Sequence, residues 1–444
     1  MRRDLSLVSI GVGIFFFLRS ANGQVRDTVQ PMNLAEIWGS IASHNHQLQL
    51  QGLKGVAASL AIIEAKDQYL PTISLNGDFK LNTKFLLYPE GLFSAPQDVP
   101  VSGYGYGLGY NLNLNLYNGG LDKRNIQLKK EEKLAMQFEY ELQHSNLKYI
   151  TAVAYYELYK FMKFKEFISA EISAEQRQLS TIEHLYKNGI VLKSDVLRIA
   201  VKLDNLELRR SEVLKRIDLT KQKLNVLMGR DEMESLQIAL QEDLNPDLQD
   251  VHTYGDYVGI AQLQSQEFKI IESTIKTSEL KLRQVKSATR PKLYLYSNYS
   301  YTYPQISFYP YSNNLWGFGQ TGLKMQWSID NAFKSKHAVA QANIHIEEQK
   351  SVMLIKQEEV NLKIRHAFLQ REQAQQQVIT AEKNIAQNTE TVRVIKNSYL
   401  NQESMLTDLL EAENALLEAK FNHISALVEL KLNHIQLLAI TGIL

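Results

Sequence analysis

The sequence predicts a membrane protein of the α+β class with two internal repeats. We expect each chain to give four strands to a trimeric, twelve-stranded transmembrane β-barrel, which continues into a long α-helical barrel. Three observations predict this fold: segments in which apolar and polar residues alternate, two very long stretches without proline, and a repeat of the whole pattern along the chain. The elements are justified below in the order in which the fold needs them.

Composition excludes several classes of function. The 444 residues include 49 Lys and Arg and 48 Asp and Glu, so the formal net charge is +1 and no global field favours nucleic acid. The chain has no cysteine, which excludes disulfides, thiolate metal sites and cysteine nucleophiles. The absence of thiols also fits an oxidising compartment.

The N-terminus, residues 1–23, is predicted to be a signal peptide. Arg2 and Arg3 precede an apolar core over 5–18, and Ala21-Asn22-Gly23 forms a small-x-small cleavage site. A transmembrane anchor is the alternative, but the core is shorter than the ~20 residues that an anchor needs. No later stretch is apolar enough to cross a membrane as a helix, so any crossing is expected to use strands.

Two segments have the period-two pattern of strands with one apolar and one polar face. In "TISLNGDFKLNT" (72–83), Asp78 and Lys80 share the polar face, and "GYGYGLGYNLNLNLYNGG" (103–120) alternates in the same way. Both have the length of a tilted barrel strand, ~9–11 residues. An ordinary antiparallel sheet with one wet face is the alternative.

Two later segments are further strand candidates. "RPKLYLYSNYSYTY" (290–303) carries tyrosine or leucine on both parities, so its faces stay unassigned. "LWGFGQTGLKMQWSID" (315–330) alternates Leu323, Met325, Trp327 and Ile329 with polar residues. The frequent tyrosines are typical of the aromatic girdles of barrels, although a carbohydrate-binding or adhesive surface would also use them.

The chain repeats itself. Pro71 matches Pro291 at an offset of 220 residues, while Asp195 matches Asp408 at 213. The difference is expected mostly in the loop between the paired strands, which is longer in the first repeat. The predicted division is a first repeat at 24–244 and a second at 245–444, each with a helix, two barrel strands, a long helix and a return helix.

The helices are predicted from proline-free periodic stretches. The two long helices cover 121–187 and about 333–398, each ~100 Å at 1.5 Å per residue. The shorter ones are expected over 34–67, with a capping pair at Asn33 and Glu36, and over 192–229, 255–288 and 404–440. In the second long helix, apolar residues at an alternating three-four spacing predict a coiled-coil seam: Val339, Ala342, Ile346, Met353, Val360, Ile364, Ala367, Ala374, Val378, Ala381, Ile385, Val392 and Ile395.

Four strands cannot close a barrel, and lipid does not tolerate open sheet edges. Two chains would give eight strands and three would give twelve. An eight-stranded barrel is filled by side chains, so only twelve strands leave a channel.

The sequence resembles the TolC-like outer membrane efflux family over about 31–444. The resemblance rests on the order, spacing and duplication of "LAEIW" (34–38), "YLPTISL" (69–75), "LYNGG" (116–120), "YKNGIVLKSDVL" (186–197) and "YLNQESMLTDLLEAENALLEAK" (399–420). It implies a homotrimer in the outer membrane with a helical tunnel in the periplasm. It also implies a periplasmic adaptor (membrane fusion protein) and an inner-membrane pump as partners. The expected function is the exit duct of a tripartite efflux or type I secretion system.

The resemblance also implies site residues. Tyr399, Asp408, Glu411 and Asp195 match positions at the constriction of the tunnel. Ser404 stands where the best-known member has an arginine, so an ionic latch is in doubt. Helix capping is the alternative role for Asp195 and Asp408, and packing for Tyr399. The hairpin tips, with Gly189, Ser194, Gln402 and Ser404, are expected to dock the adaptor.

Other functions fit less well. A non-transport trimeric envelope spacer or adhesin would not need two duplicated strand pairs with a polar face. An enzyme is not expected, because no HExxH, P-loop or GxSxG motif occurs and the ten histidines are scattered. No cofactor, metal or nucleic acid is expected, and the sequence does not choose between drug, metal and protein as cargo.

Overall fold

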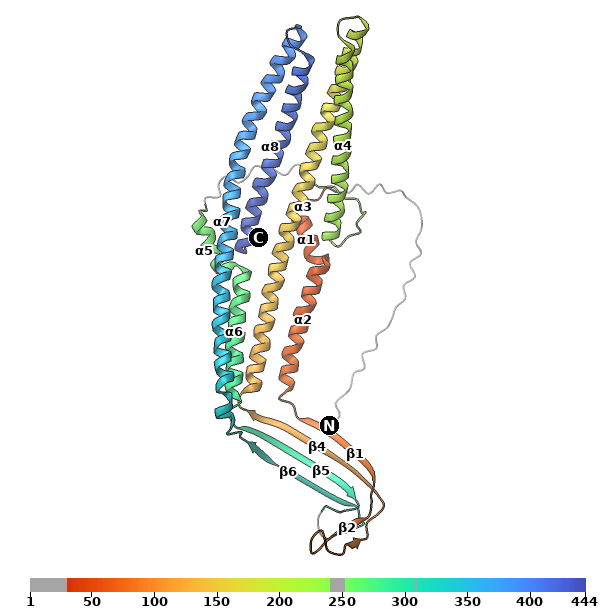
Figure 1. Cartoon of the computed structure of the whole chain (residues 1–444), viewed down its shortest axis with the longest axis vertical. Helices are drawn as coiled ribbons and strands as arrows, with labels where there is room; N and C mark the ends of the chain where they lie inside the picture. The colour runs from red at the N-terminus through yellow and green to blue at the C-terminus, as the bar shows by residue number, and fades with distance from the viewer. Residues whose placement is uncertain (1–29, 240–251, 308–309) are drawn as a thin grey trace, which may run out of the picture.

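The computed structural model describes residues 30–239, 252–307 and 310–444, which form a rod of long helices that ends in a four-stranded sheet (Figure 1). The predicted signal peptide lies outside the described residues. Two helices run the full length of the rod: α3 (Leu121–Lys187) has 67 residues and α7 (Asn331–Leu400) has 70. Two helices return from the tip, α4 (Lys193–Leu227) and α8 (Leu406–Thr441). The four helices confirm the sequence prediction.

The remaining predicted helices are each broken once. The structure has α1 (Leu34–His44) and α2 (His46–Asp67) in place of one helix, and α5 (Tyr254–Gln264) and α6 (Gln266–Ser287) in place of the other. The predicted helical segments over 34–67 and 255–288 are therefore confirmed, each with a one-residue break that was not predicted. Asn45 leaves the helical region at ψ 125°, and its side chain accepts hydrogen bonds from the backbone of Gln47 and Leu48, which starts a new helix. The predicted capping pair of Asn33 and Glu36 is present.

The two breaks form joints at mid-height of the rod. Asn45 also donates a 2.7 Å hydrogen bond to the carbonyl of Leu227, so α4 ends against the joint between α1 and α2. Gly229 follows α4 with φ 69°, and a Cβ there would collide with the carbonyl of His44. Gly442 follows α8 with φ 83°, and a Cβ there would collide with the carbonyl of Gln264, at the joint between α5 and α6. Only glycine fits so close an approach at a left-handed residue.

Each strand of the sheet is joined in the chain to one helix of the rod. Its order is β1 (Thr72–Leu81), β4 (Tyr104–Asn118), β5 (Lys292–Tyr303) and β6 (Trp316–Gln326), all antiparallel. These strands adjoin α2, α3, α6 and α7, and those helices pack in the same order. The four strands confirm the sequence prediction. The last one ends earlier than its alternation suggested: the indole of Trp327 donates to the carbonyl of Thr289 at 3.1 Å, beside the turn into α7.

The register assigns the faces that the sequence left open. Tyr299 and Tyr301 of β5 lie opposite Tyr110 and Leu108 of β4, on the predicted apolar face. Tyr294 and Tyr296 lie opposite Asn115 and Asn113, on the other face. A register shift between Asn115 and Tyr117 lies at the end of the sheet nearest α3.

The loop between β1 and β4 is longer than that between β5 and β6, as predicted. It also holds a short hairpin that was not predicted, formed by β2 (Phe85–Leu87) and β3 (Gln97–Val99).

The core lies along the helices rather than in one centre. Its largest part surrounds α3, where Tyr155 and Leu158 are fully buried. In α7 the buried residues all belong to the predicted coiled-coil seam, which is thereby confirmed: Ile346, Val360, Ile364, Ala367, Ala374, Val378 and Ala381.

Candidate functional site

The first tip of the rod is the turn between α3 and α4. Gly189 adopts φ 71°, and the amides of Asn188, Gly189 and Ile190 donate to the carbonyls of the last turn of α3. This arrangement is a left-handed helix end that satisfies carbonyls which the helix leaves without donors. Gly189 and Ser194 are both exposed, as expected of residues predicted to dock a partner.

The second tip, between α7 and α8, has the same backbone without the glycine. Gln402 takes the left-handed position at φ 61°, and the amides of Asn401, Gln402 and Glu403 repeat the hydrogen bonds of the first tip. A side chain is strained in this conformation. Gln402 is exposed, whereas Ser404 is half-buried, and its hydroxyl donates to the carbonyl of Ile395 at 3.3 Å.

Asp195 and Asp408 cap the helices that leave the two tips. Each carboxylate accepts a hydrogen bond from the backbone amide three residues earlier, Leu192 at 3.3 Å and Met405 at 3.1 Å. The capping role is therefore confirmed, as the back-bonding half of a capping box rather than at the cap position itself. Asp408 and Glu411 are both exposed on α8. Their part in a constriction stays a prediction.

Tyr399 is a packing residue in this structure. Its ring lies against the buried side chains of Ile182, Ile199 and Leu406, which join the two tips. Burial raises the pKa of Tyr399, and the negative charge of Asp195 adds to the effect. The structure thus brings together two of the predicted constriction residues, one from each hairpin.

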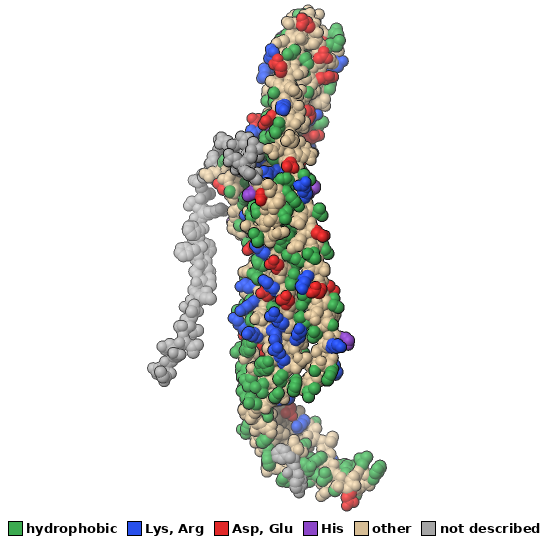
Figure 2. Space-filling view, turned by 90° about the vertical axis from the view of Figure 1, so that its left-hand side faces the viewer, with side chains coloured by type: hydrophobic (Ala, Val, Ile, Leu, Met, Phe, Trp, Pro, Cys, Tyr) green, Lys and Arg blue, Asp and Glu red, His purple; other side chains and the backbone are tan. Residues whose placement is uncertain are grey.

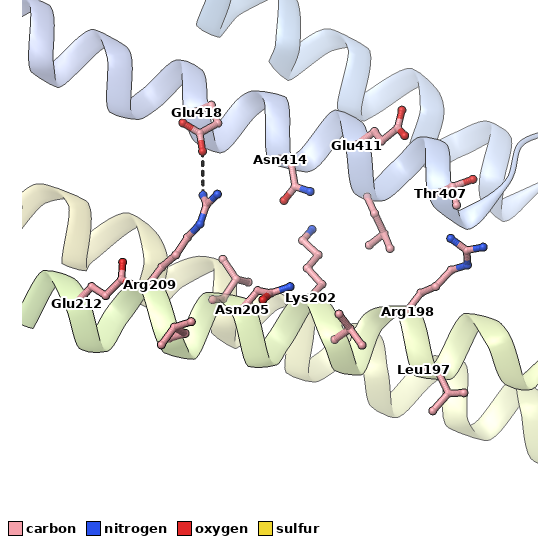
Figure 3. Close-up of a pocket in the computed structure, with 14 residues that line it drawn as sticks. Leu197, Arg198, Lys202, Asn205, Arg209, Glu212, Thr407, Glu411, Asn414 and Glu418 are labelled. Atoms are coloured by element: carbon pink, nitrogen blue, oxygen red, sulfur yellow. Dashed lines mark hydrogen bonds and ion pairs between the residues drawn. The ribbon is translucent and has the colours of Figure 1, made fainter.

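A groove of about 1030 Å³ runs beside the tips between α4 and α8 (Figure 3). Leu197, Arg198 and Val201 line it from α4, and Thr407, Glu411 and Asn414 from α8. Arg209 and Glu418 face each other across it at 2.8 Å, with their side chains 52% and 51% exposed. Such a half-exposed ion pair contributes little to stability.

A buried ion cluster beside this groove escaped the sequence prediction. The ammonium Nζ of Lys202 lies 2.6 Å from Glu175, 2.7 Å from Glu413 and 3.4 Å from Glu171. Glu175 is 1% exposed and Lys202 7%. A signal was present in the sequence: Glu175 and Lys202 occupy core positions of the three-four spacing, Glu175 between Ile172 and Leu179, and Lys202 between Ile199 and Leu206.

The three carboxylates of this cluster lie within 4.8 Å of one another, a spacing that could hold a metal ion. Lys202 already supplies the positive charge there and bonds two of them at 2.6 and 2.7 Å. The chemistry of the group is therefore that of an ion pair shared between helices. Within the ranges that the structure describes, no helix has an apolar stretch long enough to cross a membrane.

Comparison with solved structures first identifies the fold. CusC has a TM-score of 0.77 and 14% identity, covering 95% of each chain. The outer membrane protein VceC of Vibrio cholerae has a TM-score of 0.73 and 15% identity, covering 92% of this chain and 96% of that one. The outer membrane channel CmeC of Campylobacter jejuni has 0.74 and 15%, covering 92% and 85%. The shared fold is that of outer membrane channels.

The second half of the chain also matches a family model. Residues 261–443 match the model of the family described as outer membrane efflux protein. No curated protein matches the chain. The family match over 261–443 and the shared fold confirm the predicted resemblance to TolC-like outer membrane efflux proteins.

Proposed function

We propose that this protein is the exit duct of a tripartite efflux or type I secretion system. Three chains would form a twelve-stranded barrel across the outer membrane and a helical tunnel in the periplasm. An inner-membrane pump and a periplasmic adaptor would hand substrates to that tunnel. The observation that carries the proposal is a sheet with an uncovered apolar face and two unpaired edges, which passes strand by strand into a helical rod.

The uncovered face supports membrane insertion. Leu75, Phe79, Leu108 and Leu323 are 63–80% exposed. Soluble monomers rarely leave so large an apolar patch in water. Figure 2 shows hydrophobic side chains gathered where the helices meet the sheet, with Lys and Arg side chains gathered on the helices just beyond. That order matches a passage from lipid to water.

The edges support assembly into a ring. Among the strands that the structure describes, β1 and β6 each have a neighbour on one side only. The flanking helices carry unpartnered apolar stripes that continue the same two edges. They comprise Leu50, Leu53, Val56, Leu60 and Ile63 on α2, and Ile344, Ile355, Leu362 and Leu369 on α7. Each stripe has the spacing of a helix face and is suited to pack against the other in a neighbouring chain.

The tips suit two roles in such a duct. Asp408 and Glu411 lie three residues apart on one helix, so a trimer would carry two rings of three carboxylates. The groove between α4 and α8, together with the exposed Gly189 and Gln402, is the proposed docking surface for the adaptor.

The first test concerns the sheet. Leu75→Lys and Leu323→Lys place a charge on the apolar face, where a lysine at the bilayer midplane costs about 2–4 kcal/mol. We expect both variants to lower the yield of trimer in the outer membrane fraction, measured by cross-linking. Asn76→Lys and Gln320→Lys, on the opposite face, are the matched controls and should assemble normally. Equal effects on the two faces would contradict a barrel.

The second test concerns the tunnel. In planar bilayers we expect Asp408→Ala with Glu411→Ala to reduce cation selectivity and remove block by multivalent cations, because a ring of carboxylates attracts them. The paired control is Glu212→Ala with Asp218→Ala on α4. Unchanged selectivity and block in the Asp408 and Glu411 double variant would remove these residues from the constriction. A parent protein without ion-conducting pores would favour the envelope spacer instead.

A further inference from the structure

The buried ion cluster is the feature that the proposed duct does not explain. Its members come from three helices: Glu171 and Glu175 from α3, Lys202 from α4 and Glu413 from α8. The first three belong to one hairpin and the fourth belongs to the other. The cluster therefore joins the two hairpins through the interior of the rod, close to the tips.

The charges of the cluster do not balance. Three ionised carboxylates and one ammonium would leave two negative charges among side chains that are at most 20% exposed. In addition, Oε2 of Glu175 is buried and has no hydrogen-bond partner among the described residues. A buried acceptor without a donor costs free energy. A proton on Glu175 would remove one negative charge and give this oxygen a bond to Glu413.

We infer that this cluster is a proton-controlled clamp, which holds α8 against α3 and α4 while Glu175 carries a proton and loosens when the proton leaves. The inference goes beyond the proposed function, since it concerns contact between two helical hairpins and not the passage of substrates.

The titration behaviour agrees with the geometry. Burial raises the pKa of Glu175 to about 7, although the hydrogen bond and the charge of Lys202 act in the opposite direction. Burial lowers the pKa of Lys202, but its hydrogen bonds to Glu175 and Glu413 outweigh this and leave the pKa above its ordinary value. Lys202 therefore stays charged near neutral pH, and Glu175 is the group that titrates.

The direction of the effect follows from linkage. The pKa of Glu175 is about 7 in the packed arrangement, against an ordinary value of 4.5. The stabilisation is thus complete below pH 4.5 and is lost as the pH rises through about 7. Between these values, one proton changes the ratio of packed to separated hairpins by up to about tenfold per pH unit.

No other charged group in the described chain takes part in the cluster. Lys202 itself borders the open groove, and Arg198, Arg209 and Glu212 of α4 and Glu411 and Glu418 of α8 also line it. Arg209 and Glu418 also bridge α4 and α8, but their side chains are half-exposed. This pair offers a control that spans the same two helices without burial.

The test is hydrogen exchange of the full-length protein in detergent between pH 5 and pH 8.5, corrected for the intrinsic pH dependence of amide exchange. The readout is the protection of residues 406–420, with residues 46–67 of α2 as an internal reference. In the parent we expect protection of the first segment to fall by up to about tenfold for each pH unit between pH 5 and about 7, and then to level off. In Glu175→Gln, which keeps a donor toward Glu413 at every pH, protection should stay at the level found at pH 5.

Two variants complete the design. Arg209→Ala should keep the pH dependence of the parent. Lys202→Met should lower protection at every pH, because the carboxylates lose their only cation, and if it fails to fold the comparison with Glu175→Gln decides alone. A parent without pH dependence in this segment, or a Glu175→Gln variant with the same dependence as the parent, overturns the inference. Neither result depends on transport, so the proposed duct would survive it.

Discussion

The two helical hairpins share a backbone but not their side chains. α3 with α4 and α7 with α8 correspond residue by residue at an offset of 213, down to the hydrogen bonds of the tips. At that offset the fully buried Tyr155 corresponds to Phe368, which is only partly buried, and the buried Leu158 corresponds to Arg371. Glu175 and Lys202 correspond to Asn388 and Ala415.

The difference teaches which properties of the sequence set the rod. Turn residues and the three-four spacing are present in both hairpins, and they set the lengths and the tips. The bulk and charge on each seam are free to differ. The seam of the first hairpin contains buried aromatic residues and an ion cluster, whereas the seam of the second is rich in alanine.

The largest expected effect tests whether the two hairpins are packed equally well. Tyr155→Ala should cost about 3–5 kcal/mol of unfolding free energy, as for other buried aromatic side chains, because the cavity cannot fill. It also removes a 3.2 Å hydrogen bond to the carbonyl of Ala239. Phe368→Ala, at the corresponding position, should cost clearly less because its ring is partly solvated. Urea denaturation followed by circular dichroism measures both, and equal losses would mean that the two seams are equally packed.

A smaller effect is expected when the residues at the left-handed positions of the two tips are exchanged. Gly189→Gln should weaken the first tip by about 1 kcal/mol, and Gln402→Gly should strengthen the second by a similar amount. A residue with a side chain pays about 1–2 kcal/mol to adopt the left-handed conformation. Glycine avoids this cost, but part of the gain is offset because glycine loses more conformational entropy on folding. Local protection against hydrogen exchange reports each tip separately. Changes of the same sign would show that the tips are not equivalent.

The smallest effect separates the two capping aspartates. Asp195→Ala and Asp408→Ala should each cost about 0.5–1 kcal/mol, because each removes one bond to a helix start. Only the Asp195 variant should also lower the pKa of Tyr399, since the negative charge of Asp195 helps to raise it. Tyrosinate absorbance, taken as the difference from Tyr399→Phe, measures that pKa. An equal shift in the Asp408 variant would contradict the placement of Tyr399 beside Asp195.

Most of the fold could be predicted from the sequence because it depends on local periodicity. The long helices, the return helices and the four strands all have a repeating pattern, and the capping pair at Asn33 and Glu36 is a local signal. The break at Asn45 was missed because Asn is only mildly unfavourable inside a helix, and its bond to Leu227 depends on tertiary packing. The faces of β5 were left open because tyrosines occupy both parities, and only pairing with β4 assigns them.

The candidate site was predictable only in part. Capping by Asp195 and Asp408 could be predicted because each lies just after a turn, at the start of a helix, and the structure confirms it. The ion cluster joins α3 and α4 to Glu413 of α8, which lies 211 residues after Lys202. The sequence therefore shows the unusual charges at Glu175 and Lys202 but not their partner Glu413. The roles in constriction and docking need neighbouring chains and stay predictions.

The joints at Asn45 and Ser265 have a mechanical consequence. α3 and α7 run from tip to sheet, whereas α4 and α8 end at mid-height against the joints. A shift of α4 or α8 at the tip can therefore end at a joint without pulling on any strand. Only two of the four helices at the tip lead directly into a strand, so a change of shape at the far end of the rod need not move the whole sheet.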